Sequence, residues 1–161
     1  MNTSRLASEE KISQVENVII YTDGACSGNP GIGGWGAVLI FLNNEIKEIS
    51  GGNPYTTNNK MEMQAIIESL KHVKKNYRIK LYTDSLYVKN GITDWIKKWK
   101  VNGWKTANKE PVKNLELWLE MSKLAEEREI EWHWVKGHSG HKHNDRADFL
   151  ARAEIKKIAE N

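Results

Sequence analysis

The order of apolar and polar positions divides most of the chain into alternating strands and helices. Short runs of aromatic and β-branched residues between turn residues predict strands, and apolar positions three and four apart predict helices. The expected strands are Val18–Asp23, Gly33–Leu42, Glu45–Gly52, Ile79–Asp84 and Ile130–Val135. The expected helices are Asn58–Lys75, short stretches between Ser85 and Val101, Val112–Glu127 and Asn144–Ala159. Strands that alternate with helices predict an α/β fold in which helices cover a sheet.

Two of these helices carry apolar stripes, and these stripes predict part of the core. The stripe of the first helix consists of Met63, Ile66, Ile67, Leu70 and Val73. The stripe of the helix after the Trp-rich segment consists of Leu115, Trp118, Leu119 and Leu124. The pair Asn43-Asn44 between the second and third strands predicts an antiparallel hairpin.

An aspartate ends each of two predicted strands, and both belong to the same tripeptide, Tyr-Thr-Asp. These residues are Asp23 and Asp84. A turn aspartate that accepts a hydrogen bond from its own backbone is one interpretation of Asp23. If the two strands are parallel neighbours, about 4.8 Å apart, the carboxylates meet at one edge of the sheet and repel each other unless a cation or a proton intervenes. The repeated tripeptide therefore predicts a metal site.

Two further carboxylates, Glu62 and Asp148, can reach such a site from helices. Glu62 stands three residues after Asn59, so a capping box is the competing interpretation. Asp148 lies one turn into the last helix, where a solvated surface charge is the competing interpretation. Four carboxylates on separate elements indicate one site only if the fold brings them together.

The composition predicts one domain that folds without disulfides or a membrane. A chain of 161 residues is long enough to bury a core of its own. The single cysteine, Cys26, cannot form an internal bridge and fits a reducing compartment. Residues 1–17 contain no apolar run, so we expect a short flexible leader before a domain at 18–161, with no signal peptide, no membrane contact and a cytoplasmic location.

Positive charge is concentrated between Trp95 and Lys113, here called the basic segment. It holds six lysines and one glutamate, a local charge of +5 that exceeds the +3 of the whole chain. Lysines beside tryptophans suit a nucleic-acid strand, whose phosphates need cations and whose sugars need flat surfaces. The competing interpretation is that the tryptophans belong to the core and the lysines to a solvated face. The residues involved are Trp95, Lys97, Lys98, Trp99, Lys100 and Trp104.

Five sequence blocks resemble, in order, the signature blocks of type 1 ribonuclease H. They read TDGACSGNPGIGGWGAV, TTNNKMEMQA, YTDSLYVKNGI, GWKTANKEPVKN and WVKGHSGHKHNDRAD, and together they span roughly residues 18–155. The resemblance implies a ribonuclease H-like fold with a five-stranded mixed sheet, the first three strands antiparallel, and helices on its faces. It also implies four catalytic carboxylates, Asp23, Glu62, Asp84 and Asp148, and a loop histidine, His138.

The implied activity is endonucleolytic hydrolysis of the RNA strand of RNA/DNA hybrids, which leaves 5′-phosphate and 3′-hydroxyl ends. All-carboxylate ligation suits Mg²⁺, or Mn²⁺ in its place. Two ions in the substrate complex would let Asp23 bridge both, with Glu62 and Asp84 completing one site and Asp148 the other. Glu62 could also accept a hydrogen bond from a ribose 2′-hydroxyl. We expect a monomer.

The resemblance also assigns contacts to the hybrid. It places Trp95 and Trp99 along the DNA channel, Thr57 and Asn114 in a phosphate pocket, and Asn29, Asn58 and Asn59 in the minor groove. The sequence departs from the family at two positions. Tyr55 stands where many bacterial members carry a basic residue, and Leu86 stands where they carry glutamine.

Three alternatives remain open. The chain could be a nucleic-acid-binding module without catalysis, or a nuclease or strand-transfer enzyme of related fold that acts on DNA. Separately, the histidines at 138, 141 and 143 could form a transition-metal tract. The four carboxylates favour catalysis, and glycines on both sides of His138 favour a flexible loop in which it moves a proton or aids product departure.

Overall fold

The computed structural model describes residues 16–136 and 141–161, and within them the strands form one five-stranded sheet. The strands are β1 (Asn17–Ser27), β2 (Gly31–Phe41), β3 (Ile46–Thr56), β4 (Arg78–Thr83) and β5 (Glu129–Trp134). Their order across the sheet is β3-β2-β1-β4-β5. β2 is antiparallel to both β1 and β3, whereas β4 is parallel to β1 and β5. This topology confirms the predicted mixed sheet and its antiparallel first three strands.

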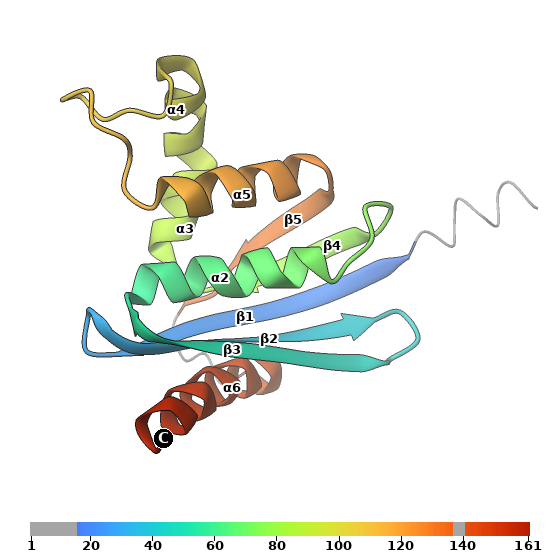
Figure 1. Ribbon diagram of the computed structural model, residues 1–161. Coiled ribbons are helices and arrows are strands. Elements are labelled where there is room, and N and C mark those ends of the chain that lie inside the picture. The colour runs from blue at the N-terminus through green and yellow to red at the C-terminus, as the bar shows by residue number, and fades with distance from the viewer. Residues whose placement is uncertain (1–15, 137–140) are drawn as a thin grey trace, which may run out of the picture.

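Helices cover both faces of the sheet (Figure 1). α2 (Asn58–Lys71) packs on β1 and β2, and α5 (Leu115–Glu126) packs beside α2. On the opposite face, α6 (Lys142–Ala159) crosses β1, β2 and β3. The segment formed by α3 (Leu86–Asn90), the π-helix η1 (Gly91–Trp95) and α4 (Ile96–Asn102) extends away from the sheet (Figure 1). The sheet face toward α2 therefore carries the core, and the other face carries α6.

The core lies between the sheet and α2. The predicted stripe of α2 is confirmed, because Met63, Ile66, Ile67, Leu70 and Val73 are all buried. In α5 the prediction was right for Trp118, which is fully buried, and wrong for Leu119, whose exposed fraction is 43%. The buried face of α5 instead combines Trp118 with Met121 and Ser122, at the three- and four-residue spacing of one helical face.

Several elements end at positions other than those predicted. β1 runs on to Ser27, because its pairing with β2 continues through the residues after Asp23. α2 ends at Lys71, four residues early, with His72 as its C-cap. α5 begins at Leu115, because Asn114 takes a left-handed conformation (φ 60°) that interrupts a helix. The sequence predicts element type well, but local backbone geometry decides where each element ends.

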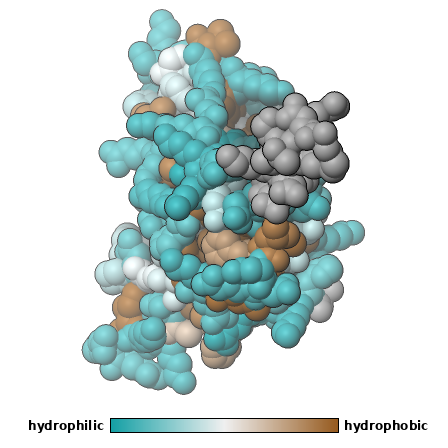
Figure 2. Space-filling model, turned by 90° about the vertical axis from the view of Figure 1, so that its right-hand side faces the viewer, coloured by the Kyte–Doolittle hydropathy of each residue, from teal (hydrophilic) through white to brown (hydrophobic). Residues whose placement is uncertain are grey.

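The side of the molecule shown in Figure 2 is mostly hydrophilic, with hydrophobic residues in separate groups. Within residues 16–136 and 141–161, no helix has the length and apolar character needed to cross a membrane.

Candidate active site

Parallel pairing of β1 with β4 brings Asp23 and Asp84 together. The last pair in this register is Tyr21 with Tyr82, so each aspartate follows two residues later on its own strand. The predicted position of Asp23 at a strand end is wrong, because β1 continues beside β2 and pairs Asp23 with Gly36. The Gly24 N–H does donate to Asp23 Oδ1 (3.0 Å), as in the turn interpretation, but within a strand. The carboxylates thus meet where β1 and β4 diverge.

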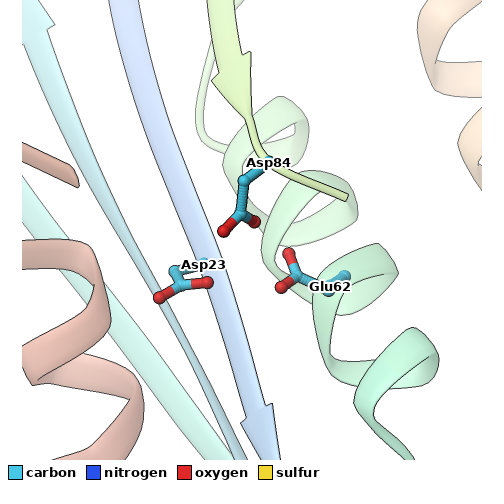
Figure 3. A group of neighbouring side chains, drawn as sticks. All are labelled: Asp23, Glu62 and Asp84. Atoms are coloured by element: carbon cyan, nitrogen blue, oxygen red, sulfur yellow. The ribbon is translucent and has the colours of Figure 1, made fainter. Parts of the chain in front are cut away.

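Glu62 reaches the same place because α2 lies directly on β1. A Cβ added to Gly24 would be 2.4 Å from the Glu62 backbone nitrogen, so only glycine allows this contact. The capping-box interpretation of Glu62 is wrong. The N-cap of α2 is Thr57, whose hydroxyl accepts a hydrogen bond from the Lys60 N–H at 3.3 Å. The Glu62 side chain is 5% exposed and points toward Asp23 and Asp84 (Figure 3).

Asp23, Glu62 and Asp84 form one acidic cluster. One carboxylate oxygen from each lies within 4.8 Å of those from the other two. The three side chains come from β1, α2 and the residue after β4, and they converge from these three directions (Figure 3). Such convergence of acidic side chains costs electrostatic free energy and indicates a cation-binding site.

Asp148 joins this cluster from α6. It lines a pocket together with Asp23 and Asp84, and it is close enough to Asp23 to raise its pKa. Its own carboxylate accepts a hydrogen bond from Arg152 Nε (3.1 Å), one turn further along α6. The structure therefore brings all four predicted carboxylates to one place, and Asp148 is paired there with the guanidinium of Arg152.

Burial makes it unfavourable for this site to carry its full negative charge. Burial, then a hydrogen bond to Asp148 and the charge of Asp84, raise the pKa of Asp23 from 3.8 to about 8. Burial and the charges of Asp23 and Asp84 raise the pKa of Glu62 well above its usual value. At neutral pH the cluster therefore retains protons unless a cation replaces them.

The donor set fits a divalent metal ion. Glu62 Oε2 is buried and, among the described residues, has no hydrogen-bond partner, which is a costly state for a carboxylate oxygen. A cation between the three carboxylates would satisfy this oxygen. Oxygen-only ligation is the preference of hard ions such as Mg²⁺, Ca²⁺ and Mn²⁺.

Other residues around the site were not predicted. Thr22, Val135, Asn144 and Asp145 also line the pocket of Asp148. The spacing of Asp145 and Asp148, three residues apart on a helix, was a signal that could have identified Asp145. Thr22 belongs to the repeated Tyr-Thr-Asp tripeptide, whereas Val135, just after β5, and Asn144, in the first turn of α6, carry no such signal.

Aromatic rings stack across the strands beside the site. Tyr21 and Tyr82 lie 4.7 Å apart between centroids with their planes 13° apart. His133 stacks on the other side of Tyr82 at 4.6 Å, and His143 of α6 lies 5.3 Å from Tyr21. His143 thus contacts the sheet, and His141 is the N-cap residue of α6. His138 lies outside the described residues.

The tryptophans of the basic segment are attached to the core. Trp95 and Trp99 each pack against the fully buried Trp118, with centroids 6.5 and 5.5 Å away, and Trp104 packs on Trp99 at 5.9 Å. The lysines remain outside. Lys98 pairs with Asp94 (3.4 Å), and Lys100 forms an ion pair with Glu126 of α5. The core interpretation of the tryptophans is therefore right in part, because these half-buried rings also support a charged surface.

The predicted polar contacts to nucleic acid lie near the start of α2. Asn29 Oδ1 accepts a hydrogen bond from the Asn58 N–H (3.1 Å), and Asn58 and Asn59 are the first two residues of α2. Asn114 Nδ2 donates to the Tyr87 hydroxyl (3.0 Å) and lines a pocket of about 500 Å³ with Lys60, which was not predicted. The two departures from the family are both accessible, with exposed fractions of 73% for Tyr55 and 69% for Leu86.

A mixed sheet in this order, with carboxylates converging from β1, α2, β4 and α6, defines a protein of the ribonuclease H-like class. The family model described as RNase H matches residues 15–156, and the chain belongs to this family. It is 61% identical to the ribonuclease H of Ehrlichia ruminantium (strain Gardel), covering 89% of this chain and 98% of that one. It is 60% identical to the ribonuclease H of Wolbachia pipientis wMel, covering 87% and 96%.

Solved structures show the same fold. LC9-RNase H1, described as a type 1 RNase H with the type 2 active-site motif, superposes with a TM-score of 0.80 at 31% identity, covering 89% of this chain and 74% of that chain. The N-terminal RNase H domain of rv2228c from Mycobacterium tuberculosis gives 0.67 at 27% identity, covering 89% and 96%. LC11-RNase H1, solved in complex with an RNA/DNA hybrid, gives 0.66 at 24% identity, covering 88% and 99%.

Proposed function

We propose that this protein hydrolyses the RNA strand of RNA/DNA hybrids endonucleolytically, leaving 5′-phosphate and 3′-hydroxyl ends. The observation that carries this proposal is the convergence of Asp23, Glu62 and Asp84 within 4.8 Å beside Asp148, on the fold of the RNase H family. Family membership favours the hybrid as substrate over either homoduplex.

Four carboxylates would hold the metal. We assign Asp23, Glu62 and Asp84 to one ion and Asp23 with Asp148 to a second, with Mg²⁺ as the ion and Mn²⁺ as a substitute. When bound, two such ions would lower the pKa of an attacking water and stabilise negative charge on the leaving oxygen of a phosphodiester. The residues themselves must first release protons, because the pKa of Asp23 is about 8 and that of Glu62 is also raised.

Glu62 and residues outside the acidic cluster would orient the substrate. Glu62 can accept a hydrogen bond from a ribose 2′-hydroxyl, the group that distinguishes RNA from DNA. The lysines at 97, 98 and 100 would neutralise phosphates of the DNA strand, beside Trp95, Trp99 and Trp104. Asn29, Thr57, Asn58, Asn59 and Asn114 would make the polar contacts. His138 stays a prediction from sequence, with proton transfer or product departure as its role.

The test offers labelled RNA/DNA, RNA/RNA and DNA/DNA duplexes to the protein, each with Mg²⁺ and with a chelator. We expect cleavage of the RNA in the hybrid only, with Mg²⁺ only. Binding of the hybrid without cleavage would favour a module that has lost catalysis. Cleavage of DNA/DNA would favour a nuclease that acts on DNA. We further propose a monomer in the cytoplasm, and light scattering of the purified protein tests its oligomeric state.

A further inference from the structure

The position of Asp148 depends on how the start of α6 sits on the sheet. The N-cap residue of α6, His141, makes no side-chain capping hydrogen bond. Two glycines of β2 let the helix backbone approach closely. An added Cβ would be 2.5 Å from the Ala147 carbonyl oxygen at Gly36 and 2.1 Å from that of Ala151 at Gly34. These contacts set the distance between helix and sheet.

A charged pair ties this part of α6 to β3. Arg146 Nε and Nη2 donate to Glu48 Oε2 and Oε1, at 2.5 and 2.9 Å. A two-pronged bond between a planar guanidinium and a carboxylate fixes orientation as well as distance. The Arg146 guanidinium also lies 4.9 Å from the centre of the Phe149 ring, so its own rotation is restricted on a second side.

The pair lies at the edge of a partly apolar pocket. This pocket, of about 420 Å³, is lined by the apolar residues Val38, Ile46 and Phe149 as well as by the pair. The hydrogen bond from Arg146 lowers the pKa of Glu48, so this carboxylate stays ionised to a lower pH than an ordinary glutamate. Lys142, His143 and Asp145 are the other polar residues that line the pocket.

We propose that Glu48 and Arg146 are positioning residues, which hold the first two turns of α6 so that the Asp148 carboxylate faces Asp23. Arg146 precedes Asp148 by two residues on α6, and Glu48 pairs with Val38 on the β2 strand that carries Gly36. The pair therefore restrains the helix directly beside the residue that must reach the cluster. This inference rests on the proposed function.

A matched ion pair elsewhere supplies the control. Lys71 Nζ and Glu120 Oε1 lie 2.6 Å apart and join α2 to α5, on the sheet face away from α6. Their side chains are exposed to a similar degree, 45% and 42%, against 46% and 34% for Arg146 and Glu48. Glu48→Gln and Glu120→Gln therefore each weaken an ion pair of similar exposure, and only the first adjoins Asp148.

The first readout is kinetic, on an RNA/DNA hybrid with saturating Mg²⁺. Groups hydrogen-bonded to a metal ligand typically contribute about 10- to 100-fold. Because Glu48 acts on Asp148 only through the helix, we expect Glu48→Gln to lower kcat by the smaller of these factors, about 10-fold, with KM unchanged. Glu120→Gln should keep the kcat of the wild type. The double variant Glu48→Arg with Arg146→Glu should recover much of the loss seen for Arg146→Glu alone. Equal kcat values for Glu48→Gln and Glu120→Gln would overturn the proposal, as would no recovery in the double variant.

The second readout needs no substrate. Mn²⁺ added to the protein alone broadens the NMR signals of nearby backbone amides in a distance-dependent way. In Glu48→Gln we expect weaker broadening at Asp148 and unchanged broadening at Asp84, whereas Glu120→Gln should match the wild type at both. Unchanged broadening at Asp148 would overturn the proposal. If the wild type binds Mn²⁺ but cleaves no hybrid, the proposed function fails. The broadening at Asp148 would then still test the role of Glu48 and Arg146.

Discussion

At the scale of residues, the acidic cluster gathers negative charge and, within the part of the chain that the structure describes, has no positive charge at its centre. Glu62 carries a buried oxygen without a partner among the described residues, and Asp23 and Glu62 both have raised pKa values. These features follow from one arrangement, because acids that are buried together retain protons until a cation arrives. Stability, proton binding and metal binding are therefore linked in this protein.

The metal-free protein should lose stability as the pH rises. The pKa of Asp23 is about 8 in the folded protein against 3.8 as its ordinary value. A raised pKa stabilises the fold fully below the unfolded value, near pH 4, and this contribution is lost as the pH rises toward 8. We expect the melting temperature in chelator to fall by on the order of 10 °C more in the wild type than in Asp23→Asn between pH 5 and 9. Equal pH profiles for the two proteins would contradict the shift.

Asp23→Asn and Asp84→Asn should fold normally and lose activity. The amide has nearly the size of the carboxylate and removes the repulsion within the cluster, so melting temperatures in chelator should not fall. Cleavage of the hybrid should drop by orders of magnitude, because each carboxylate is one of the proposed metal ligands. Single-turnover rates measure this loss. Asp145→Asn, which lines the pocket outside the cluster, should lose much less, and near-normal turnover in Asp84→Asn would remove that residue from the site.

The sequence identified the four carboxylates but not all of their surroundings. The repeated Tyr-Thr-Asp tripeptide predicted that Asp23 and Asp84 meet, and the register of β1 and β4 brings them together. Glu62 was ambiguous because Asn59 and Glu62 have the spacing of a capping box. Only the backbone conformation of Thr57 shows which residue is the N-cap. Contacts between distant segments, such as Tyr21 with His143, leave no local pattern in a single sequence.

At the scale of elements, the glycines of β2 determine how closely α6 approaches the sheet. Gly36 pairs with Asp23 across the strands and contacts Ala147 of the helix, the residue before Asp148. A single glycine thus lies between two of the proposed metal ligands. Hydrophobic periodicity predicted both the strand and the helix. Their close approach depends on the absence of a side chain at Gly36, which a hydrophobic pattern cannot reveal.

Gly36→Ala should separate α6 from the site. The new Cβ would lie 2.5 Å from the Ala147 carbonyl oxygen, and a backbone atom cannot move aside without the helix. Overpacking of this kind costs about 1–3 kcal/mol, so we expect a melting temperature lower by about 2–12 °C. Turnover of the hybrid should also fall at temperatures where the variant is fully folded, because Asp148 moves with the helix.

Gly52→Ala provides the control for this substitution. Its nearest neighbour would be Ile158 Cδ1 at 2.8 Å, the end of a flexible side chain near the C-terminal end of α6. We expect a smaller change in melting temperature and normal turnover. If both variants lost turnover equally, the contact at Gly36 would have no special relation to Asp148.

At the scale of the whole molecule, the two sheet faces differ in what they support. α2 and α5 bury the core on one face, and Trp118 of that core supports Trp95 and Trp99. α6 brings Asp148 from the other face. The basic segment is therefore attached to the stable core and not to the site, which predicts that binding and chemistry can be altered separately.

Replacing lysines of the basic segment should weaken binding and leave turnover intact. Removing one lysine–phosphate ion pair should make the dependence of log affinity on log salt concentration shallower by about 0.7–0.9. We expect Lys97→Ala and Lys98→Ala to raise KM at unchanged kcat. Lys100→Ala should change the salt slope less, because Glu126 already neutralises part of its charge. Binding isotherms at several salt concentrations measure the slope, and a lower kcat at saturating substrate would contradict this role.

The stacked rings beside the site give the protein an internal optical probe. Tyr21 and Tyr82 lie face to face, and each precedes by two residues one of the aspartates of the cluster. Two phenol rings this close share their ultraviolet transitions, so their circular dichroism depends on the spacing and angle between the rings. A cation bound between Asp23 and Asp84 would shift the two strands that carry the rings. Binding of an ion should therefore change the near-ultraviolet circular dichroism spectrum of the unlabelled protein. Tyr82→Leu should abolish the part of this change that comes from the stacked rings.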